Sequence, residues 1–334
     1  VAESGEETVK TALFLTGCFV LPLVGMQSSG TVASEAATPD PVGLGSTQEL
    51  TFPVQASLLL DDPFDRSEGI TFNGEGELFV AANAAAWHVD ASGHPTKLTD
   101  LYSNLGMAAM GDRDFLVADF GPTNGFSHGP NDDGIVWRVT PAGEKTAFAR
   151  GIGDPNAILM RPDGSFLVSD DATDKIYLVD GGGTVTVFSD AIDYPNGLAF
   201  SLDGRTLYVA QIFQSINPMV PDDRVWAMPL DEDGMPNGPS TVLGRVGEGE
   251  APDGLVVDEL GRVYVAANGG GRVYRFDPRS GERVIIAENV PSIASLVFGQ
   301  GAFDSHTLYG TSTYAGGGKV WVIPVGVGGG PVYR

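Results

Sequence analysis

Short apolar runs, separated by turns rich in glycine and proline, recur through most of the chain. The clearest unit is residues 250–278, where the pattern predicts three strands, at 254–257, 262–267 and 272–277. Strands joined by connections this short form an antiparallel meander. Asp253 stands where the chain enters the first of these strands. The unit therefore combines a small sheet with a carboxylate at one of its ends.

The same unit repeats at a spacing of roughly forty to fifty residues, which is typical of propeller blades. Its copies share a first strand, a turn and a second strand, and they lie at 68–81, 156–169, 196–210 and 253–266, with weaker copies at 104–118 and 294–311. Third and fourth strands follow, for example at 135–139 and 146–149. No helical periodicity separates the copies. We predict an all-β fold, a six-bladed β-propeller of four-stranded antiparallel blades.

The two ends of this propeller are expected to share one blade. After residues 319–323 only a glycine-rich tail remains, so the sixth blade lacks an outer strand from that part of the chain. Residues 55–60 precede the first copy and are expected to supply it. Such sharing protects the open strand edges of a ring. We therefore assign residues 51–334 to a single propeller domain.

The first 36 residues resemble a secretory signal, because Lys10 precedes an apolar run and small residues that suit cleavage. The run is too short and too interrupted by proline and glycine to span a bilayer comfortably. Residues 15–18, Leu-Thr-Gly-Cys, resemble a lipobox, so a lipid anchor at Cys18 is an alternative. Residues 37–50, rich in Pro, Gly and Thr, form a linker. We expect a secreted or periplasmic protein without a membrane span.

Composition narrows the function classes. The formal net charge of -24 disfavours nucleic acid as a partner, because phosphates require Lys and Arg, and it disfavours anionic membrane surfaces equally. A hydrophobic content of 42% supplies a core, and a single cysteine excludes an intrachain disulfide. Some of the carboxylates are free to serve a cation, although acidity also simply favours solubility.

Four copies present a side-chain oxygen at the entrance of the first strand: Glu68, Asn156, Asn196 and Asp253. First strands line the channel of a propeller, so these groups are expected at one end of it. Two carboxylates and two amides suit a hard cation such as Ca²⁺ or Mg²⁺, and no Cys or His cluster indicates structural zinc. The alternative is that Asn-Gly and Asp-Gly only form turns. Because the oxygen-bearing residues recur at the same position of these copies, we favour the metal site over the turns.

Four segments carry a resemblance to a known family. They are P-D-G-L-V-V-D-E-L-G-R-V-Y-V-A-A-N-G-G-G-R-V-Y-R-F-D-P at 252–278, P-N-G-L-A-F-S-L-D-G-R-T-L-Y-V-A at 195–210, S-E-G-I-T-F at 67–72, and V-F-G with T-L-Y-G-T-S at 297–299 and 307–312. The chain from about residue 58 to 323 resembles the SMP-30/gluconolactonase/luciferin-regenerating-enzyme family. The resemblance implies a six-bladed propeller with a divalent cation, usually calcium, and hydrolysis of lactones or organophosphate esters.

The resemblance also implies roles for the entrance residues. Glu68, Asn196 and Asp253 take the positions of metal ligands, and Asn156 that of an asparagine that touches the metal or the substrate. The cofactor implied is Ca²⁺, with Mg²⁺, Mn²⁺ and Zn²⁺ as alternatives. The third copy has Pro-Asn-Ala where the family has Asn-Asp-Gly, so sugar-lactone specificity does not carry over. Asp253 is the first choice as general base, with nucleophile or pure ligand as the alternatives.

Two long loops, at 120–133 and 211–223, connect second to third strands and should surround the site. Phe126 and Phe213, with Ile216 and Met219, are expected to shape a pocket for a substrate less polar than a sugar. His128 is the one histidine on such a loop and a candidate for contact with substrate and for catalysis. Asp170 and Asp171, after a second strand, are expected to be solvated. Tryptophans recur on third strands, which indicates blade packing: Trp87, Trp137, Trp226 and Trp321.

Three functions are compatible with this sequence. The first is a divalent-metal-dependent hydrolase, a lactonase or esterase that opens a small-molecule lactone or ester with activated water. The second is a non-catalytic propeller that binds a ligand or a protein, with a structural cation. The third is phosphotriester hydrolysis at the same site.

Overall fold

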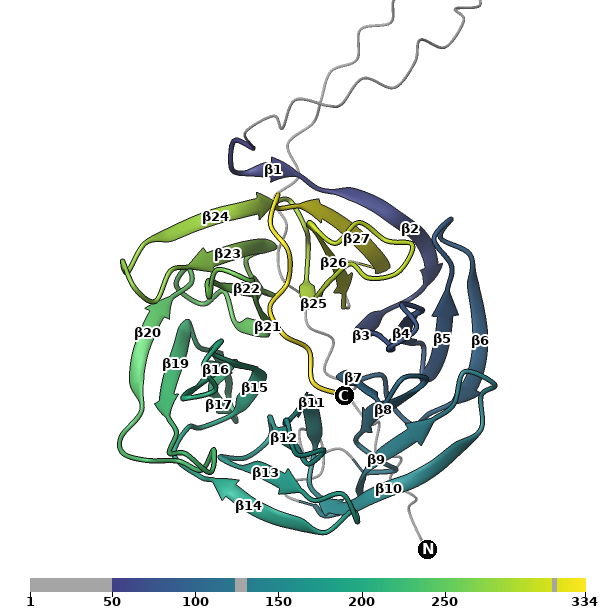
Figure 1. Ribbon diagram of the computed structural model, residues 1–334, viewed down its shortest axis with the longest axis horizontal. Helices are drawn as coiled ribbons and strands as arrows, with labels where there is room; N and C mark the ends of the chain where they lie inside the picture. The colour runs from purple at the N-terminus through teal and green to yellow at the C-terminus, as the bar shows by residue number, and fades with distance from the viewer. Residues whose placement is uncertain (1–49, 124–130, 314–316) are drawn as a thin grey trace, which may run out of the picture. The chain divides into compact units, whose positions relative to one another are not determined.

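The computed structural model describes residues 50–123, 131–313 and 317–334, all within one compact unit, Glu49–Arg334. These residues contain strands and turns and no helix. Six antiparallel sheets surround a central channel (Figure 1), so the predicted six-bladed propeller is confirmed. The signal-like segment 1–36, Phe126 and His128 lie outside the described residues. Within the described ranges, no helix has the length and apolar character needed to cross a membrane.

Each blade places its first strand at the channel and its fourth at the rim. Blade 1 contains β3 (Ser67–Phe72), β4 (Leu78–Ala82), β5 (Ala85–Val89) and β6 (Pro95–Asp100). Blade 2 contains β7 (Met107–Met110), β8 (Asp114–Asp119), β9 (Gly134–Val139) and β10 (Lys145–Ile152). Blade 3 contains β11 (Pro155–Met160), β12 (Phe166–Asp170), β13 (Ile176–Val179) and β14 (Val185–Ser189). Blade 4 contains β15 (Pro195–Phe200), β16 (Thr206–Gln211), β19 (Arg224–Pro229) and β20 (Thr241–Arg245). Blade 5 contains β21 (Pro252–Val257), β22 (Val263–Ala267), β23 (Arg272–Phe276) and β24 (Arg283–Glu288). Blade 6 contains β25 (Ile293–Phe298), β26 (Thr307–Ser312), β27 (Gly318–Pro324) and the early strand β2 (Ser57–Phe64).

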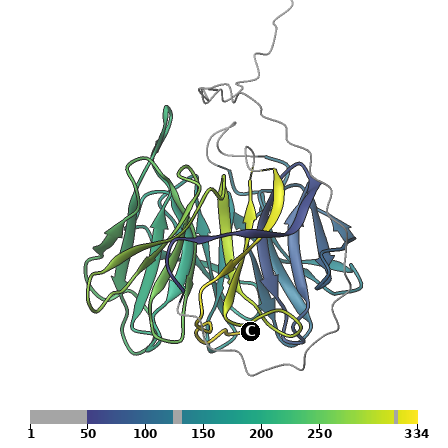
Figure 2. The same cartoon turned by 90° about the horizontal axis from the view of Figure 1, so that it is seen from above.

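Two strands from the start of the described chain join the last two blades. β2 pairs antiparallel with β27, with Ser57 opposite Val322, and completes blade 6 as predicted. β1 (Val54–Gln55) adds a short parallel strand to β24 of blade 5, which the sequence pattern did not predict. Figure 2 shows this purple segment crossing the outside of the ring. The ring is therefore closed by segments that are distant in the sequence.

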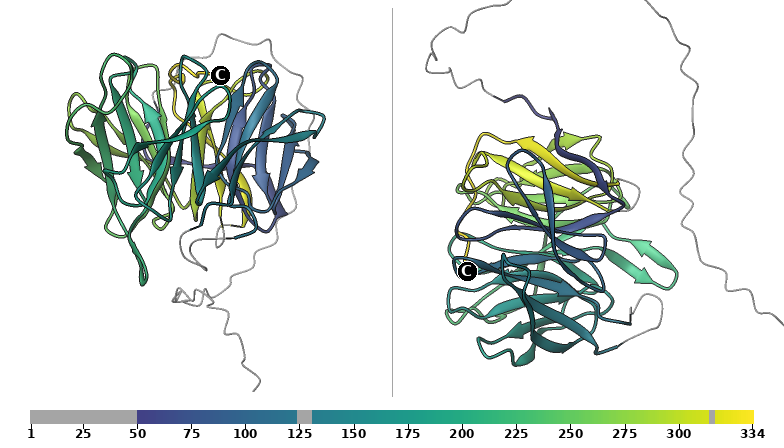
Figure 3. Two further views of the ribbon diagram at one scale, coloured as in Figure 1. Left: turned by 90° about the horizontal axis from the view of Figure 1, so that it is seen from below. Right: turned by 90° about the vertical axis from the view of Figure 1, so that its right-hand side faces the viewer.

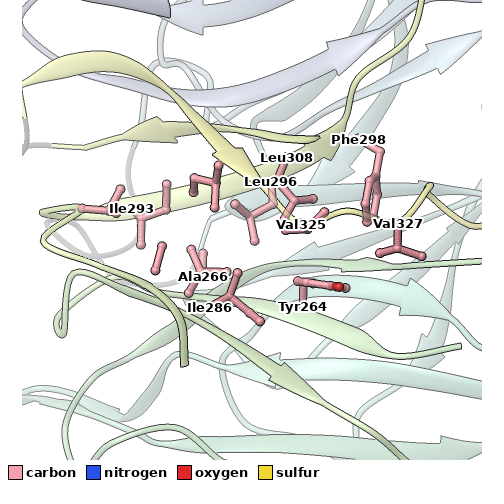
Figure 4. Packing of buried hydrophobic residues seen from close by; sticks show 13 residues of the cluster. Tyr264, Ala266, Ile286, Ile293, Leu296, Phe298, Leu308, Val325 and Val327 are labelled. Carbon is pink, nitrogen blue, oxygen red and sulfur yellow. The ribbon is translucent and has the colours of Figure 1, made fainter. Parts of the chain in front are cut away.

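The core lies between neighbouring blades. Between blades 5 and 6, Tyr264 and Ile286 face Leu296 and Phe298 across the gap (Figure 4). Burial of such side chains stabilises the fold by about 1.5–3 kcal/mol each. Because every blade face is covered by the next blade, the second strands are buried on both faces and read as continuous apolar runs rather than as an alternation.

The tryptophans on the third strands each donate a hydrogen bond to the end of the second strand of the same blade. Their Nε1 partners are the carbonyl oxygen of Ala82 for Trp87, Oδ2 of Asp119 for Trp137, Oε1 of Gln211 for Trp226 and Oγ of Ser312 for Trp321, at 2.6–2.9 Å. The tryptophans therefore pack within the blades, as the sequence indicated. They also fix the strand ends that border the face with the candidate site.

Candidate functional site

The four entrance residues occupy the same place in four blades. Glu68, Asn156, Asn196 and Asp253 are each the second residue of an innermost strand: β3, β11, β15 and β21 respectively. The interpretation of Asn-Gly and Asp-Gly as turns is wrong, because both pairs lie inside strands. Neither Gly197 nor Gly254 has a positive φ.

The glycines that follow Glu68, Asn196 and Asp253 allow neighbouring strands to approach each other closely. A Cβ on Gly197 would lie 2.1 Å from the carbonyl oxygen of Asp253, and one on Gly254 would lie 2.6 Å from that of Ala294. Gly69 and Gly106 are placed in the same way against the strands of blades 2 and 3. Only glycine fits at this spacing. The tight contact brings the entrance residues of successive blades toward one another around the channel mouth.

Glu68 is fixed by blade 6 as well as by its own strand. The Thr311 hydroxyl donates to the carbonyl oxygen of Glu68, and Ser67 Oγ donates to the carbonyl oxygens of Ser312 and Lys319 at 3.2 and 3.1 Å. The Glu68 side chain is half-buried, whereas Asn156, Asn196 and Asp253 are only 5%, 2% and 4% exposed. The glutamate is therefore the most accessible of the four.

Hydrogen bonds connect the entrance residues to one another and to their surroundings. Nδ2 of Asn156 lies 3.5 Å from Oε1 of Glu68, across the channel between blades 1 and 3. Nδ2 of Asn268 donates to Oδ2 of Asp253 at 2.9 Å, and also to Oγ1 of Thr313 at 3.2 Å. The repeat pattern did not identify Asn268, which lies in the glycine loop after β22. Its place on the site-facing loop of blade 5 was the available signal.

Asp171 also belongs to this group, which corrects a prediction. Asp170 and Asp171 were expected to be solvated, but they are 0% and 5% exposed. Oδ2 of Asp171 accepts a hydrogen bond from Nδ2 of Asn156 at 2.7 Å. The prediction was wrong because Asp170 is the last residue of β12 and Asp171 directly follows it, beside Asn156 on the innermost strand of the same blade.

Burial and neighbouring negative charges make ionisation of the acidic side chains in this site less favourable. Burial raises the pKa of Glu68 well above its usual range, and the negative charges of Asp253 and Asp171 raise it further. Burial raises the pKa of Asp253 to about 7, against an opposing effect of the hydrogen bond from Asn268. Burial and then the charge of Asp170 raise the pKa of Asp171. A cation close to these groups would favour their ionised forms.

The donor set fits a hard divalent cation. Oδ1 of Asn196 is buried and accepts no hydrogen bond from the described residues, so it is an oxygen that a cation would satisfy. No group of three or more Asp, Glu, His and Cys side chains in the described residues can hold a metal ion by itself. Binding at this mouth therefore requires the amide oxygens of Asn156 and Asn196 beside the carboxylates of Glu68 and Asp253. Mixed carboxylate and amide ligands are typical of calcium.

Blades 2 and 6 contribute no polar side chain at the same position. Leu105 precedes Gly106 as Glu68 precedes Gly69, and Ala294 is the second residue of β25. The candidate ligands therefore come from blades 1, 3, 4 and 5. The apolar positions leave the coordination to four side chains and to any further oxygens that enter through the mouth.

The second long loop forms a hairpin rather than an irregular loop. β17 (Phe213–Ile216) pairs with β18 (Met219–Pro221), and Figure 3 shows this green hairpin projecting from the ring. The Phe213 ring packs edge-on against Tyr194 at 6.5 Å between ring centroids, and Tyr194 directly precedes the strand of Asn196. Phe213 therefore lies beside the candidate site, whereas Met219 is 37% exposed on the projecting arm.

The opposite mouth of the channel is covered by the last residues of the chain. A cavity of about 620 Å³ lies between the six innermost strands and residues 328–334. The amide of Glu259 donates to the carbonyl oxygen of Gly328, and the amide of Gly330 donates to that of Val257. Figure 1 shows the C-terminus at the centre of the ring. The C-terminal residues therefore cover the mouth opposite to Glu68 and Asp253.

Comparison with known protein families gives a match over part of this chain. Residues 168–314 match the family described as "SMP-30/Gluconolactonase/LRE-like region", a range that contains Asn196 and Asp253 but neither Glu68 nor Asn156. Regucalcin from Danio rerio is 31% identical over 185 residues, which cover 54% of this chain and 60% of that protein. Pentonolactonase XacC from Haloferax volcanii is 27% identical over 194 residues, 56% of this chain and 62% of that protein.

The chain spans about half the length of the curated relatives it matches. Among solved structures, a calcium-binding protein, regucalcin, from Agrobacterium tumefaciens has a TM-score of 0.66 at 23% identity, covering 84% of this chain and 97% of that one. That similarity shows a shared fold. Residues 168–314 match the model of this family, so the family resemblance seen in the sequence is confirmed.

Proposed function

We propose that the protein is a divalent-metal-dependent hydrolase, a lactonase that opens a lactone or ester by attack of water. The observation that carries the proposal is the convergence of Glu68, Asn156, Asn196 and Asp253 at one channel mouth. Ca²⁺ is the proposed cation, because carboxylate and amide oxygens without His or Cys favour it. The similarity to a pentonolactonase supports a lactone as the substrate class.

Each entrance residue has a part in the proposed reaction. Glu68, Asn156, Asn196 and Asp253 would hold the cation, which when bound supplies polarisation of the carbonyl group and of water. Asn268 holds one oxygen of Asp253, so the other oxygen is available to the reacting groups. Asp253 then accepts the proton of the attacking water as general base. Asp253 is only 4% exposed, so this general base has little contact with bulk water.

The surroundings of the site favour a substrate with an apolar part. Phe213 and Tyr194 form an aromatic pair beside the strand of Asn196. An aromatic wall contacts alkyl or ring substituents of a lactone better than the hydroxyl groups of a sugar. We therefore include a preference for apolar lactones or aryl esters in the proposal, together with a secreted or periplasmic location.

A panel of alkyl lactones, sugar lactones, aryl esters and phosphotriesters, assayed in Ca²⁺ and in EDTA, tests this function. We expect Ca²⁺-dependent turnover of at least one lactone or ester, and loss of about 100-fold or more in kcat in Asp253→Ala. Glu282→Ala removes an exposed charge from the same blade and should leave turnover unchanged. A protein that binds Ca²⁺ but turns over no member of the panel would favour a binding propeller. Turnover of the phosphotriester alone would favour phosphotriester hydrolysis.

A further inference from the structure

Asp171 is a buried carboxylate that accepts a hydrogen bond from a candidate metal ligand. It directly follows β12, and it is 5% exposed. Oδ2 accepts from Nδ2 of Asn156 at 2.7 Å, while Oδ1 is buried and accepts no hydrogen bond from the described part of the chain. A buried, charged acceptor held so close is a strong partner for an amide N–H. This hydrogen bond therefore fixes the orientation of the Asn156 amide group.

An asparagine amide has two unlike ends, and only its oxygen can bind a cation. In Asn156 the nitrogen is directed to Asp171 at 2.7 Å, and its distance to Glu68 Oε1 is at the limit of hydrogen bonding, 3.5 Å. Asp171 thus binds the amide nitrogen of Asn156 and leaves its amide oxygen for a cation. Without Asp171, the acceptor that remains beside Nδ2 is Glu68, which is itself a candidate ligand.

The charges around Asp171 agree with a role toward a cation. Asp170, Asp154 and Asp253 all raise the pKa of Asp171, after the larger effect of burial. Asp171 in turn raises the pKa of Glu68. Three carboxylates from blades 1, 3 and 5 thus lie around the Asn156 amide, and the positive charge of Arg66 lowers the pKa of Glu68 in return.

We infer that Asp171 is a positioning residue for the cation site: it binds the amide nitrogen of Asn156 and so presents Oδ1 of Asn156 to the cation. This inference rests on the proposed function. Asp171 acts through Asn156, because its Oδ2 accepts the hydrogen bond of the Asn156 amide at 2.7 Å. Groups that orient ligands in this way typically contribute about 10–100-fold to metal affinity.

The test measures Ca²⁺ binding to the purified protein by isothermal titration calorimetry, with Ca²⁺ alone as the ligand. Asp171→Ala removes the acceptor, and its Kd should rise by about ten-fold or more. Asp171→Asn keeps an oxygen that accepts from Asn156, and it should recover most of the affinity. Asp174→Asn is the matched control, because Asp174 lies in the same loop, pairs with Lys175, and is half-exposed. Its Kd should equal that of the wild type.

Thermal unfolding in EDTA separates this role from a general contribution to the fold. Removing a buried carboxylate among other carboxylates should leave the Tm of the cation-free protein unchanged or higher, while the rise in Tm on adding Ca²⁺ becomes smaller. Equal Kd values in wild type and Asp171→Ala would overturn the inference, as would equal losses in the Ala and Asn variants, which would indicate charge alone. Failure of the wild type to bind Ca²⁺ would overturn both the inference and the proposed function.

Discussion

Nδ2 of Asn268 donates to Oδ2 of Asp253 at 2.9 Å, and the same nitrogen lies 3.2 Å from Oγ1 of Thr313. Asn268 follows β22 and Thr313 follows β26, so one side chain connects the candidate catalytic carboxylate to blade 6. The amide is also placed by its backbone, because the Asn268 N–H donates to the carbonyl oxygen of Ala251. Asp253 is therefore held from outside its own strand.

Asn268→Ala should weaken this support. We expect about a ten-fold loss in Ca²⁺ affinity or in kcat, the usual magnitude for a residue that orients a ligand. Calorimetry and steady-state kinetics measure the two effects. Asn237→Ala, at an exposed position of the 230–240 turn, is the control and should behave as wild type. Unchanged affinity and unchanged kcat would mean that the Asn268 hydrogen bond has no role in the site.

Gly197→Ala should disturb the spacing of blades 4 and 5. The added Cβ would lie 2.1 Å from the carbonyl oxygen of Asp253, and main-chain atoms cannot move aside as a flexible side chain can. Overpacking of this kind typically costs about 1–3 kcal/mol in the free energy of unfolding. Urea denaturation measures it. Gly181→Ala, with no heavy atom within 4 Å of its Cβ, should change stability by less than about 0.5 kcal/mol.

The stability of the cation-free protein should depend on pH through Asp253. Its pKa is about 7 in the folded protein, against 3.8 for an ordinary Asp, so the folded state binds the proton more tightly than the unfolded chain. The free energy of unfolding in EDTA should therefore fall as pH rises from about 4 to about 7. The raised pKa of Glu68 acts in the same direction.

Denaturation in EDTA at several pH values between about 4 and 8 measures this dependence, and Asp253→Asn should flatten it. Because protons and Ca²⁺ compete for the same carboxylates, the Ca²⁺ affinity of the wild type should rise over this range. A wild-type curve in EDTA that is flat or rises between about pH 4 and 7 would contradict the assignment.

Asp119→Ala should destabilise blade 2. The Asp119 carboxylate is fully buried and accepts hydrogen bonds from the amides of Tyr102, Ser103 and Gly121, from the Ser103 hydroxyl and from Nε1 of Trp137, at 2.8–3.2 Å. Its removal leaves five partly buried donors without their acceptor, so we expect a loss of about 3 kcal/mol in the free energy of unfolding. Trp fluorescence during denaturation reports it. Asp112→Ala, at an exposed turn, should cost less than about 0.5 kcal/mol; equal costs would show that the Asp119 bonds contribute little.

Several features of this protein could be predicted from the sequence because they depend on local pattern. Apolar runs of strand length at a regular spacing predicted the blades, and the C-terminal shortage of one strand predicted that β2 completes blade 6. Oxygen-bearing residues at equivalent places in the repeats predicted the four entrance positions. Repetition carried this information, because residues at the same place in each blade face the same channel mouth.

Tertiary structure alone decided the rest. The burial of Asp171 against Asn156, the support of Asp253 by Asn268 and the pairing of Glu68 with blade 6 join residues that are 15 to 243 positions apart in sequence. The Asn-Gly and Asp-Gly pairs read locally as turns, yet they lie in strands. Their glycines are required because the neighbouring blade leaves no room for a Cβ. Sequence pattern determined which side chains reach the channel mouth, whereas packing between blades decided their contacts, their burial and therefore their charge.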